Sequence, residues 1–339
     1  TFMAKVPSTP EDSSIGVLNG IERICEQSGI DPTAVRKVMH GTTVATNAVI
    51  TRKGAKLGLV TTRGYRQVLQ VPRSFCPGGL GGWVSYVKAP LMAPLELTIE
   101  ADERLDADGN VVTPLDEAAL ARDLEALKDK GEVEALTICL LNSYVNGVHE
   151  VEARDIAQNV FGDIPISISS EVVPEMQEYE RTETTVVNSY VRPQVSRYVA
   201  NLQNSLEERL GDDLSLAILR SDGGLASARA AGESPVNLLL SGPAGGVAGA
   251  IYFCQRGGFE NILTFDMGGT STDVALIQNG EARVRRETRV GDTTVRAPSV
   301  DVRTIGAGGG SIAFVPDLTK ALRVGPDSAG AEPGPAAYK

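Results

Sequence analysis

The stretch from Asn261 to Ile277 reads NILTFDMGGTSTDVALI, and it indicates the fold more strongly than any other part of the chain. An apolar run ends at Asp266, a polar turn follows, and Asp273 opens a second apolar run. Two apolar runs separated by a glycine-rich turn are typical of paired strands, so the stretch predicts a β-hairpin.

The composition of the turn favours a phosphate-binding loop. Gly268 and Gly269 have no side chain, so the backbone can approach an anion closely and direct successive N–H groups at it. The hydroxyls of Thr270, Ser271 and Thr272 add hydrogen-bond donors. Asp266 and Asp273 would repel a bare phosphate but suit one that carries Mg²⁺, which prefers oxygen ligands. The alternative is an ordinary tight hairpin with polar residues at its tip.

The composition indicates a globular protein that is long enough for two domains. The chain has 339 residues, of which 42% are hydrophobic and 22% charged. Its formal net charge of −11 and its aromatic content of 5% argue against a nucleic-acid-binding surface. No apolar run is long enough to span a membrane, and the first residues do not resemble a signal peptide.

Cysteine and histidine usage indicates a reducing compartment. The four cysteines are far apart, no Cys-x-x-Cys occurs, and the only histidines are His40 and His149. We therefore expect neither a zinc site nor a disulfide framework, and we expect a cytoplasmic location. His149 is expected to be a capping or core residue rather than a metal ligand.

Strands and amphipathic helices alternate over the first half of the chain. Buried strands are predicted at residues 57–62 and 135–141, with an amphipathic helix between them. This alternation indicates an α/β domain. A largely helical segment follows at residues 171–210, and its front is taken as the boundary between domains 1–172 and 173–339.

Several polar segments lie where predicted elements meet. His40-Gly-Thr-Thr43 leads from a strand into a helix that begins near Val44, and SGPAGG, residues 241–246, enters a later helix. Such entrances can bind an anion, but they can also cap the helix or allow close packing. A third glycine cluster, RTIGAGGGS, occupies residues 303–311. EYERTETT, residues 178–185, is typical of a solvated helix face with ion pairs.

These motifs together resemble known families. DMGGTSTD between two strands resembles the phosphate loop of the actin, sugar-kinase and chaperone ATPase superfamily. FDMGGTSTDVALI, HGTTVATNA, EYERTETT and SGPAGG resemble the hydantoinase A/5-oxoprolinase family. PGGLGGW, residues 77–83, and Met92-Ala-Pro-Leu resemble acetone and acetophenone carboxylases more narrowly. The resemblance implies an α/β, two-domain actin-like (ribonuclease-H-like) ATPase fold that is truncated at both ends.

The resemblance also implies roles for individual residues. Asp266 would hold Mg²⁺ through water, the turn Gly268 to Thr272 would bind the phosphates of ATP, and Asp273 would orient the attacking oxygen. The other implied nucleotide-binding positions are the glycines of the SGPAGG turn and of the third cluster (Gly245, Gly246, Gly306, Gly308, Gly309, Gly310). The implied substrate-side and cleft-facing residues are those of the HGTT and EYER blocks (His40, Thr42, Thr43, Asn47, Glu178, Arg181, Thr185).

The implied function is ATP-dependent phosphorylation of an oxygen in a small substrate. In a ketone carboxylase that oxygen belongs to an enolate, with bicarbonate activated alongside. In a hydantoinase or 5-oxoprolinase it is the oxygen of a lactam. The family works with a second, hydantoinase B-type subunit, so such a partner is expected, and nucleic acid and membrane are not.

A missing motif keeps a non-catalytic alternative open. The family has a first phosphate loop of the type GGTFTD before a block that resembles Lys5-Val-Pro-Ser-Thr-Pro10. This chain contains only one such loop. If the protein has lost the first phosphate loop, it would be a nucleotide-binding assembly subunit rather than a catalyst. A sugar kinase shares the phosphate loop but lacks support from HGTTVATNA and EYERTETT.

Overall fold

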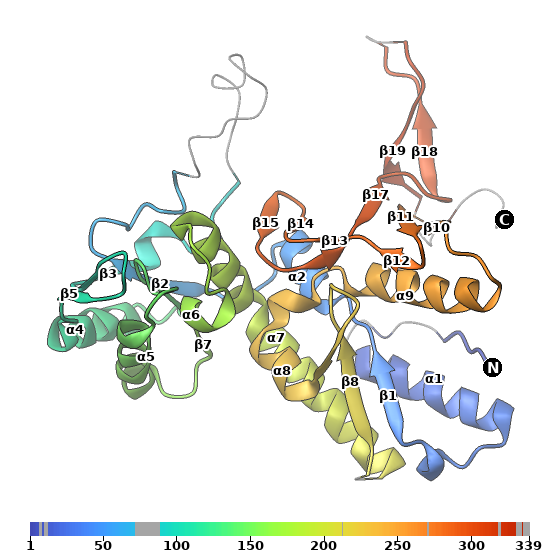
Figure 1. Ribbon diagram of the computed structural model, residues 1–339, viewed down its shortest axis with the longest axis horizontal. Coiled ribbons are helices and arrows are strands. Elements are labelled where there is room, and N and C mark those ends of the chain that lie inside the picture. Colours follow the sequence, from blue (N-terminus) through green and yellow to red (C-terminus); the bar gives the residue numbers. More distant parts are fainter. Residues whose placement is uncertain are drawn as a thin grey trace.

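The computed structural model describes residues 1–6, 9, 13–71, 89–211, 213–269, 271–317, 320–329 and 334. Figure 1 shows the helices and strands in two lobes, joined by the long helix α7. The PGGLGGW segment lies outside the described residues, as does Thr270.

A parallel four-stranded sheet forms the core of the lobe on the left of Figure 1. Its spatial order is β3-β2-β6-β7, with bounds Thr98–Ala101, Leu57–Thr62, Ala135–Cys139 and Ile166–Ile168. All residues of β2 and β6 are buried because helices cover both faces of the sheet. Helices α4 (Glu117–Lys128) and α5 (Val148–Phe161) pack on one face, and α7 (Glu178–Leu210) packs on the other. The predicted α/β domain is confirmed.

Helix α7 connects this sheet to the rest of the molecule. It is 33 residues long, and its first half packs Val186 and Val187 against Leu57 of β2. Its second half packs Leu202 and Leu206 against Leu18 of helix α1 (Ser13–Ser28). One helix therefore carries side chains into two separate hydrophobic clusters.

A second sheet joins sequence-distant parts of the chain. Strand β1 (Lys37–His40) pairs in parallel with β8 (Ser215–Leu219), which pairs with β9 (Leu225–Ser227) in antiparallel orientation. Residues on both sides of the expected boundary at 172 thus share a sheet. The division into domains 1–172 and 173–339 therefore stays a proposal, namely that these two segments fold as separate units.

The predicted hairpin is present in a third sheet. Strands β10 (Ile262–Met267) and β11 (Thr272–Gln278) are antiparallel, and β17 (Val302–Ile305) and β12 (Glu281–Ala282) also pair with β11. Helix α9 (Ser241–Arg256) packs Val247 on Ala275 and Ile277 of this sheet. The opposite face carries apolar side chains that are largely exposed (Leu263, Phe265, Met267, Leu276).

The remaining elements are short. The helices are α2 (Val44–Thr51), α6 (Ser169–Val172) and α8 (Ala228–Glu233), with 3₁₀ turns at Pro32–Ala34, Leu95–Leu97 and Pro235–Leu238. The antiparallel strand pairs are β4 (Arg104–Leu105) with β5 (Val111–Thr113), β13 (Val284–Arg285) with β16 (Ser299–Val300), β14 (Thr288–Val290) with β15 (Thr293–Val295), and β18 (Ser311–Phe314) with β19 (Arg323–Ser328).

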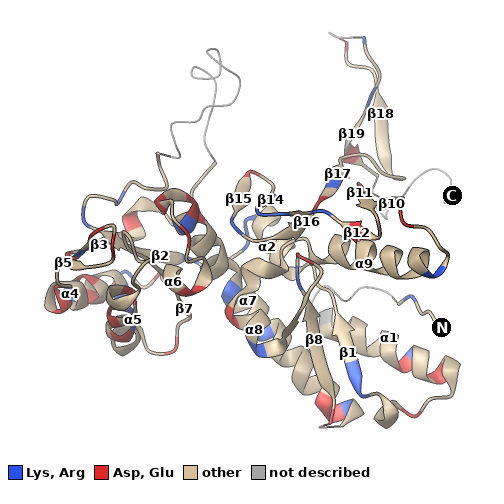
Figure 2. Cartoon of the chain, in the orientation of Figure 1, with Lys and Arg blue, Asp and Glu red and all other residues tan. Residues whose placement is uncertain are grey.

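The surface charge is distributed over several helices. Figure 2 shows acidic positions along α1, α4 and α5, and basic positions on and near α8. In the part of the chain that the structure describes, no helix has the length and apolarity needed to cross a lipid bilayer.

Candidate functional site

The hairpin places the two acids of the motif side by side. Asp266 on β10 is paired in register with Asp273 on β11, one residue pair before the turn. The Gly268 N–H donates to the Ser271 carbonyl oxygen at 2.8 Å, which closes the turn. The Asp273 carboxylate accepts a hydrogen bond of 2.6 Å from the Thr304 hydroxyl of β17, whereas the exposed Asp266 carboxylate has no partner among the described residues.

The third glycine cluster packs directly on the hairpin turn. The Gly309 N–H donates to Gly268 O at 2.9 Å, and the Gly310 N–H donates to Gly269 O at 2.7 Å. A Cβ atom on Gly308 would lie 2.5 Å from Gly268 O, so no larger residue fits there. The structure therefore brings together the two glycine segments that sequence reasoning assigned to one nucleotide.

Thr272 differs from its expected role. Its side chain is buried, and its hydroxyl donates to Ala307 O at 2.6 Å. The hydroxyl therefore links the hairpin to the glycine cluster and is not available to a phosphate. Ser271 is half-buried at the turn and remains a candidate donor.

The entrance of helix α9 shares a cavity with both acids. Gly246, Asp266 and Asp273 line a cavity of about 390 Å³ between α9 and the hairpin. Gly246 has open space where a Cβ would be, as expected for a position that faces a ligand. Gly245 does not line this cavity: a Cβ there would lie 2.6 Å from Leu219 Cδ2, so its role is close packing against β8.

Magnesium would be held at this cavity by few protein ligands. Among the described residues, no group of three or more His, Cys, Asp or Glu side chains is arranged to bind a metal ion. Mg²⁺ keeps several water molecules and commonly binds one or two carboxylates together with phosphate oxygens. The Asp266 carboxylate, which none of the described residues contacts by a hydrogen bond or ion pair, fits that requirement together with Asp273 opposite it.

The HGTT block lies at the entrance of α9. The Ser241 hydroxyl donates to Thr42 O at 3.0 Å, and the Leu240 N–H donates to Thr46 Oγ1 at 2.9 Å. Leu240 adopts a left-handed conformation, with φ of 61°, immediately before α9 begins. Since Gly246 of the same helix reaches the hairpin cavity, α9 physically connects the HGTT block with the two acids.

Side chains of the HGTT block differ in accessibility. His40 is half-buried, its Nε2 lies 2.7 Å from the Tyr198 hydroxyl of α7, and burial lowers the pKa of its imidazole. Thr42 is buried, and its Oγ1 accepts from the Val44 N–H of the first residue of α2. Thr43 and Asn47 are exposed and hydrogen-bonded to each other at 3.2 Å.

The EYER block does not face an open cleft as expected. Arg181 is 1% exposed, and its guanidinium donates to Leu140 O at 2.6 Å and to Ser169 Oγ at 3.1 Å. Thr185 is also fully buried, and its hydroxyl donates to Arg181 O. Both face the interior because α7 packs on β6 at this point. Glu178 stays half-buried, 3.5 Å from Arg181 Nη1.

Arg296 holds the start of α7 through several contacts. Its Nη1 lies 3.2 Å from Glu175 Oε2 and its Nε lies 3.0 Å from Glu287 Oε1. Its backbone N–H donates to Thr184 Oγ1 at 2.8 Å. The EYERTETT segment is therefore not the solvated helix face that its composition favours, because Arg181, Thr184 and Thr185 are buried against the rest of the protein.

Sequence reasoning missed the residues that support the site from other elements. Tyr198, the partner of His40, lies 158 positions away in the middle of α7, and no local pattern marks it. Thr304 could have been noticed, because it lies in the third glycine cluster itself, one apolar residue before Gly306.

Comparisons with known proteins cover nearly the whole chain. A family model described as hydantoinase/oxoprolinase N-terminal region matches residues 2–161, and one described as hydantoinase/oxoprolinase matches residues 181–339. The gamma subunit of acetophenone carboxylase from Aromatoleum aromaticum is 31% identical over 99% of this chain and 48% of its own length.

Two solved structures share the fold. The ATP-dependent caprolactamase from Pseudomonas jessenii matches with a TM-score of 0.87 and 34% identity, over 100% of this chain and 49% of its own. The nucleotide-free structure of an ATP-dependent acetone carboxylase matches with a TM-score of 0.81 and 30% identity, over 96% and 47%. The expected actin-like α/β fold is confirmed. The chain spans about half the length of the curated relatives it matches.

Proposed function

Because the chain belongs to the hydantoinase/oxoprolinase family, we propose that it is the ATP-handling part of an enzyme that phosphorylates an oxygen of a small substrate. One observation carries this proposal: Asp266, Asp273 and the entrance of α9 line one cavity. It lies beside the doubled glycine turn, by which we mean the hairpin turn with the third glycine cluster packed on it. The caprolactamase and the acetone carboxylase that share the fold are both ATP-dependent.

The residues of the hairpin would bind and orient ATP. The backbone from Gly268 to Ser271, including Thr270, would surround the phosphates, and the outer edge of the third cluster, at Gly306 and Gly309, would receive adenosine. Asp266 would hold Mg²⁺, which, when bound, neutralises charge on the phosphates. Asp273, fixed by the Thr304 hydroxyl, would orient the attacking oxygen. That oxygen forms a bond to the γ-phosphorus while the bond between this phosphorus and the leaving oxygen of ADP breaks.

The HGTT block would bind the substrate. Thr43 and Asn47 present exposed polar groups at the entrance of α2, beside the entrance of α9. The neutral imidazole of His40, held by Tyr198, is suited to hydrogen-bond a carbonyl or enolate oxygen. Glu178 stays a candidate at the start of α7, and Arg181 acts from the interior by positioning the segments that follow β6 and β7.

Ketone carboxylation is our first choice of reaction, in a complex with a hydantoinase B-type subunit and in the cytoplasm. The substrate would be a ketone whose enolate oxygen is phosphorylated, with bicarbonate activated alongside. Lactam hydrolysis is the second candidate, and the higher structural similarity to the caprolactamase favours it. An assembly subunit without catalysis is the remaining alternative.

Calorimetric titration with Mg-ATP tests the nucleotide site. We expect saturable binding that Asp266→Asn weakens by about tenfold or more. Asp317→Asn is the matched control, because Asp317 is an exposed carboxylate that lies outside the site. Equal affinity of the Asp266 variant and the wild type would contradict the proposal.

Nucleotide hydrolysis then separates the reactions. Together with the B-type subunit, release of ADP that depends on both a ketone and bicarbonate supports carboxylation. Release that depends on a lactam such as caprolactam supports the second candidate. If the protein binds ATP but releases no ADP with either a ketone and bicarbonate or a lactam, the non-catalytic assembly subunit is the remaining interpretation.

A further inference from the structure

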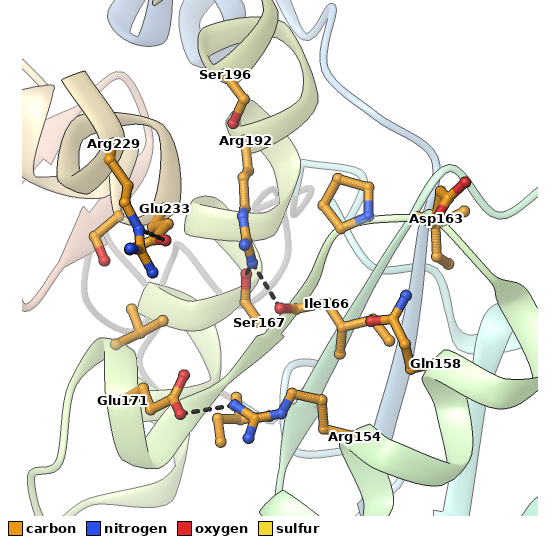
Figure 3. A pocket seen from close by; sticks show the side chains of 15 residues that line it. Arg154, Gln158, Asp163, Ile166, Ser167, Glu171, Arg192, Ser196, Arg229 and Glu233 are labelled. Atoms are coloured by element: carbon orange, nitrogen blue, oxygen red, sulfur yellow. Dashed lines mark hydrogen bonds and ion pairs between the residues drawn. The ribbon is translucent and has the colours of Figure 1, made fainter.

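A second cavity lies in a different part of the molecule from the hairpin. It has a volume of about 770 Å³ and opens between α5, β7, α7 and α8 (Figure 3). Its lining contains no residue of the hairpin, the glycine clusters or the HGTT block. The charged residues of the lining are three arginines and three acids (Arg154, Arg192, Arg229, Asp163, Glu171, Glu233).

Two of the three arginines already have carboxylate partners. Arg154 Nη1 lies 2.7 Å from Glu171 Oε1, and Arg229 Nε lies 2.8 Å from Glu233 Oε1. Figure 3 shows the Arg192 side chain extending from α7 between these two pairs. Within the described part of the chain, Arg192 has no ion pair.

The guanidinium of Arg192 is only partly satisfied by its neighbours. Its Nη1 donates to Ile166 O at 2.6 Å and to Ser167 Oγ at 3.2 Å. These contacts cover β7, the last strand of its sheet, and edge protection by a charged side chain is a sufficient reason for them. They leave Nε and Nη2 without a partner among the described residues.

Ser167 adds a second available donor. Its side chain is 3% exposed and lines the cavity. Its Oγ accepts from Arg192 Nη1 and from Asn188 Nδ2, both at 3.2 Å. Because both contacts use the oxygen as an acceptor, the hydroxyl proton remains free to donate.

An arginine in this situation favours an anion. Arginine keeps its charge at all physiological pH values, and burial lowers the pKa of Arg192, so the surroundings oppose that charge. Its free Nε and Nη2 form the planar fork that matches two oxygens of a carboxylate or phosphate. Glu171 and Glu233 each already pair with another arginine, so the Arg192 fork has no carboxylate of its own among the described residues.

We propose that this cavity binds a small molecule through one oxyanion group, a carboxylate or a phosphate, held by Arg192 and Ser167. The site is independent of the nucleotide site proposed above. Its volume exceeds that of a simple ion, so the rest of the ligand would lie along Ile164 and Val172, which also line the cavity.

The test uses acetate and inorganic phosphate as probes, because they separate the two chemistries. We expect one of them to bind with an affinity that Arg192→Gln reduces about tenfold or more. Phosphate is titrated on the Gly308→Ala background, so that the hairpin turn contributes less. Arg197→Gln is the matched control, since Arg197 is an exposed arginine of the same helix.

Two further measurements keep the test decisive. Ser167→Ala removes one donor without changing charge and should weaken binding several-fold. In ¹⁵N spectra, the Arg192 Nε–H signal, assigned by its absence in R192Q, should shift during the titration of the wild type. No shift with either probe, or equal losses in the Arg192 and Arg197 variants, would overturn the proposal.

Discussion

Arg181 shows how one residue type can support two opposite interpretations. An arginine in a polar helical segment is expected at a surface or a cleft, and the resemblance to an ATPase family strengthened that expectation. The structure buries it with the Leu140, Ser169 and Glu175 oxygens as acceptors and stacks it 5.3 Å from the Tyr144 ring. A buried charge with this many partners contributes chiefly to folding.

We therefore expect Arg181→Gln to reduce stability more than it reduces nucleotide binding. Removing one member of a buried, hydrogen-bonded charge arrangement costs about 3–5 kcal/mol. The free energy of unfolding, measured by urea denaturation, should fall by this amount, whereas Arg197→Gln should change it little. A variant of full stability that has lost turnover would instead assign Arg181 to catalysis.

His40 gives the second prediction at this scale. Burial lowers its pKa from the ordinary value of 6.5, so the unfolded state takes up a proton at a higher pH than the folded state does. The contribution of His40 to stability is complete above pH 6.5 and is lost as the pH falls from 6.5 towards the lower folded-state pKa. Melting temperatures at pH 7.5 and 5.5 should therefore differ less in His40→Gln than in the wild type. An equal pH response in both proteins would contradict this.

At the scale of elements, much of the site could be predicted because its signals are local. Glycines and hydroxyls between two apolar runs specify the hairpin, and the paired Asp266 and Asp273 follow from its register. The use of each glycine could not be predicted in the same way. Gly245 and Gly246 are neighbouring glycines, and nothing in the sequence distinguishes them. Gly245 packs on Leu219, whereas Gly246 lines the cavity. That difference depends on β8, which lies far away in the chain.

Gly308 tests whether the doubled glycine turn matters for the nucleotide. A Cβ there would overlap Gly268 O, Gly269 C and Ser271 N, at 2.5, 2.9 and 2.9 Å. All three are backbone atoms, so relief of the clash must move the turn. Gly308→Ala should cost about 1–3 kcal/mol and weaken Mg-ATP binding.

Gly249→Ala, in helix α9, is the control. A Cβ at Gly249 would meet no atom within 4 Å, its φ does not require glycine, and it does not line the hairpin cavity. Its effect on stability should be small. If the Gly308 variant binds Mg-ATP with the same affinity as the wild type, the packed turn is not the phosphate site.

At the scale of the whole molecule, long-range pairing limits what the sequence can reveal. A strand before His40 was expected and β9 was not, and the pairing of β1 with β8 spans about half the chain and has no local pattern. A domain boundary drawn from helix and strand order therefore separates residues 37–40 from the strand they pair with. The same connection brings the HGTT block to the entrance of α9.

The last prediction concerns cooperativity between the two lobes. Leu206 of α7 is fully buried against α1, and the same helix packs on the parallel sheet through Val186 and Val187. If α7 couples the lobes, Leu206→Ala, which should cost about 2–5 kcal/mol, will lower the melting temperature of the whole chain in one transition. Leu225→Ala, at a largely exposed position, is the control. Two transitions, of which only one shifts, would show instead that residues 1–172 and 173–339 unfold as separate units despite sharing a sheet.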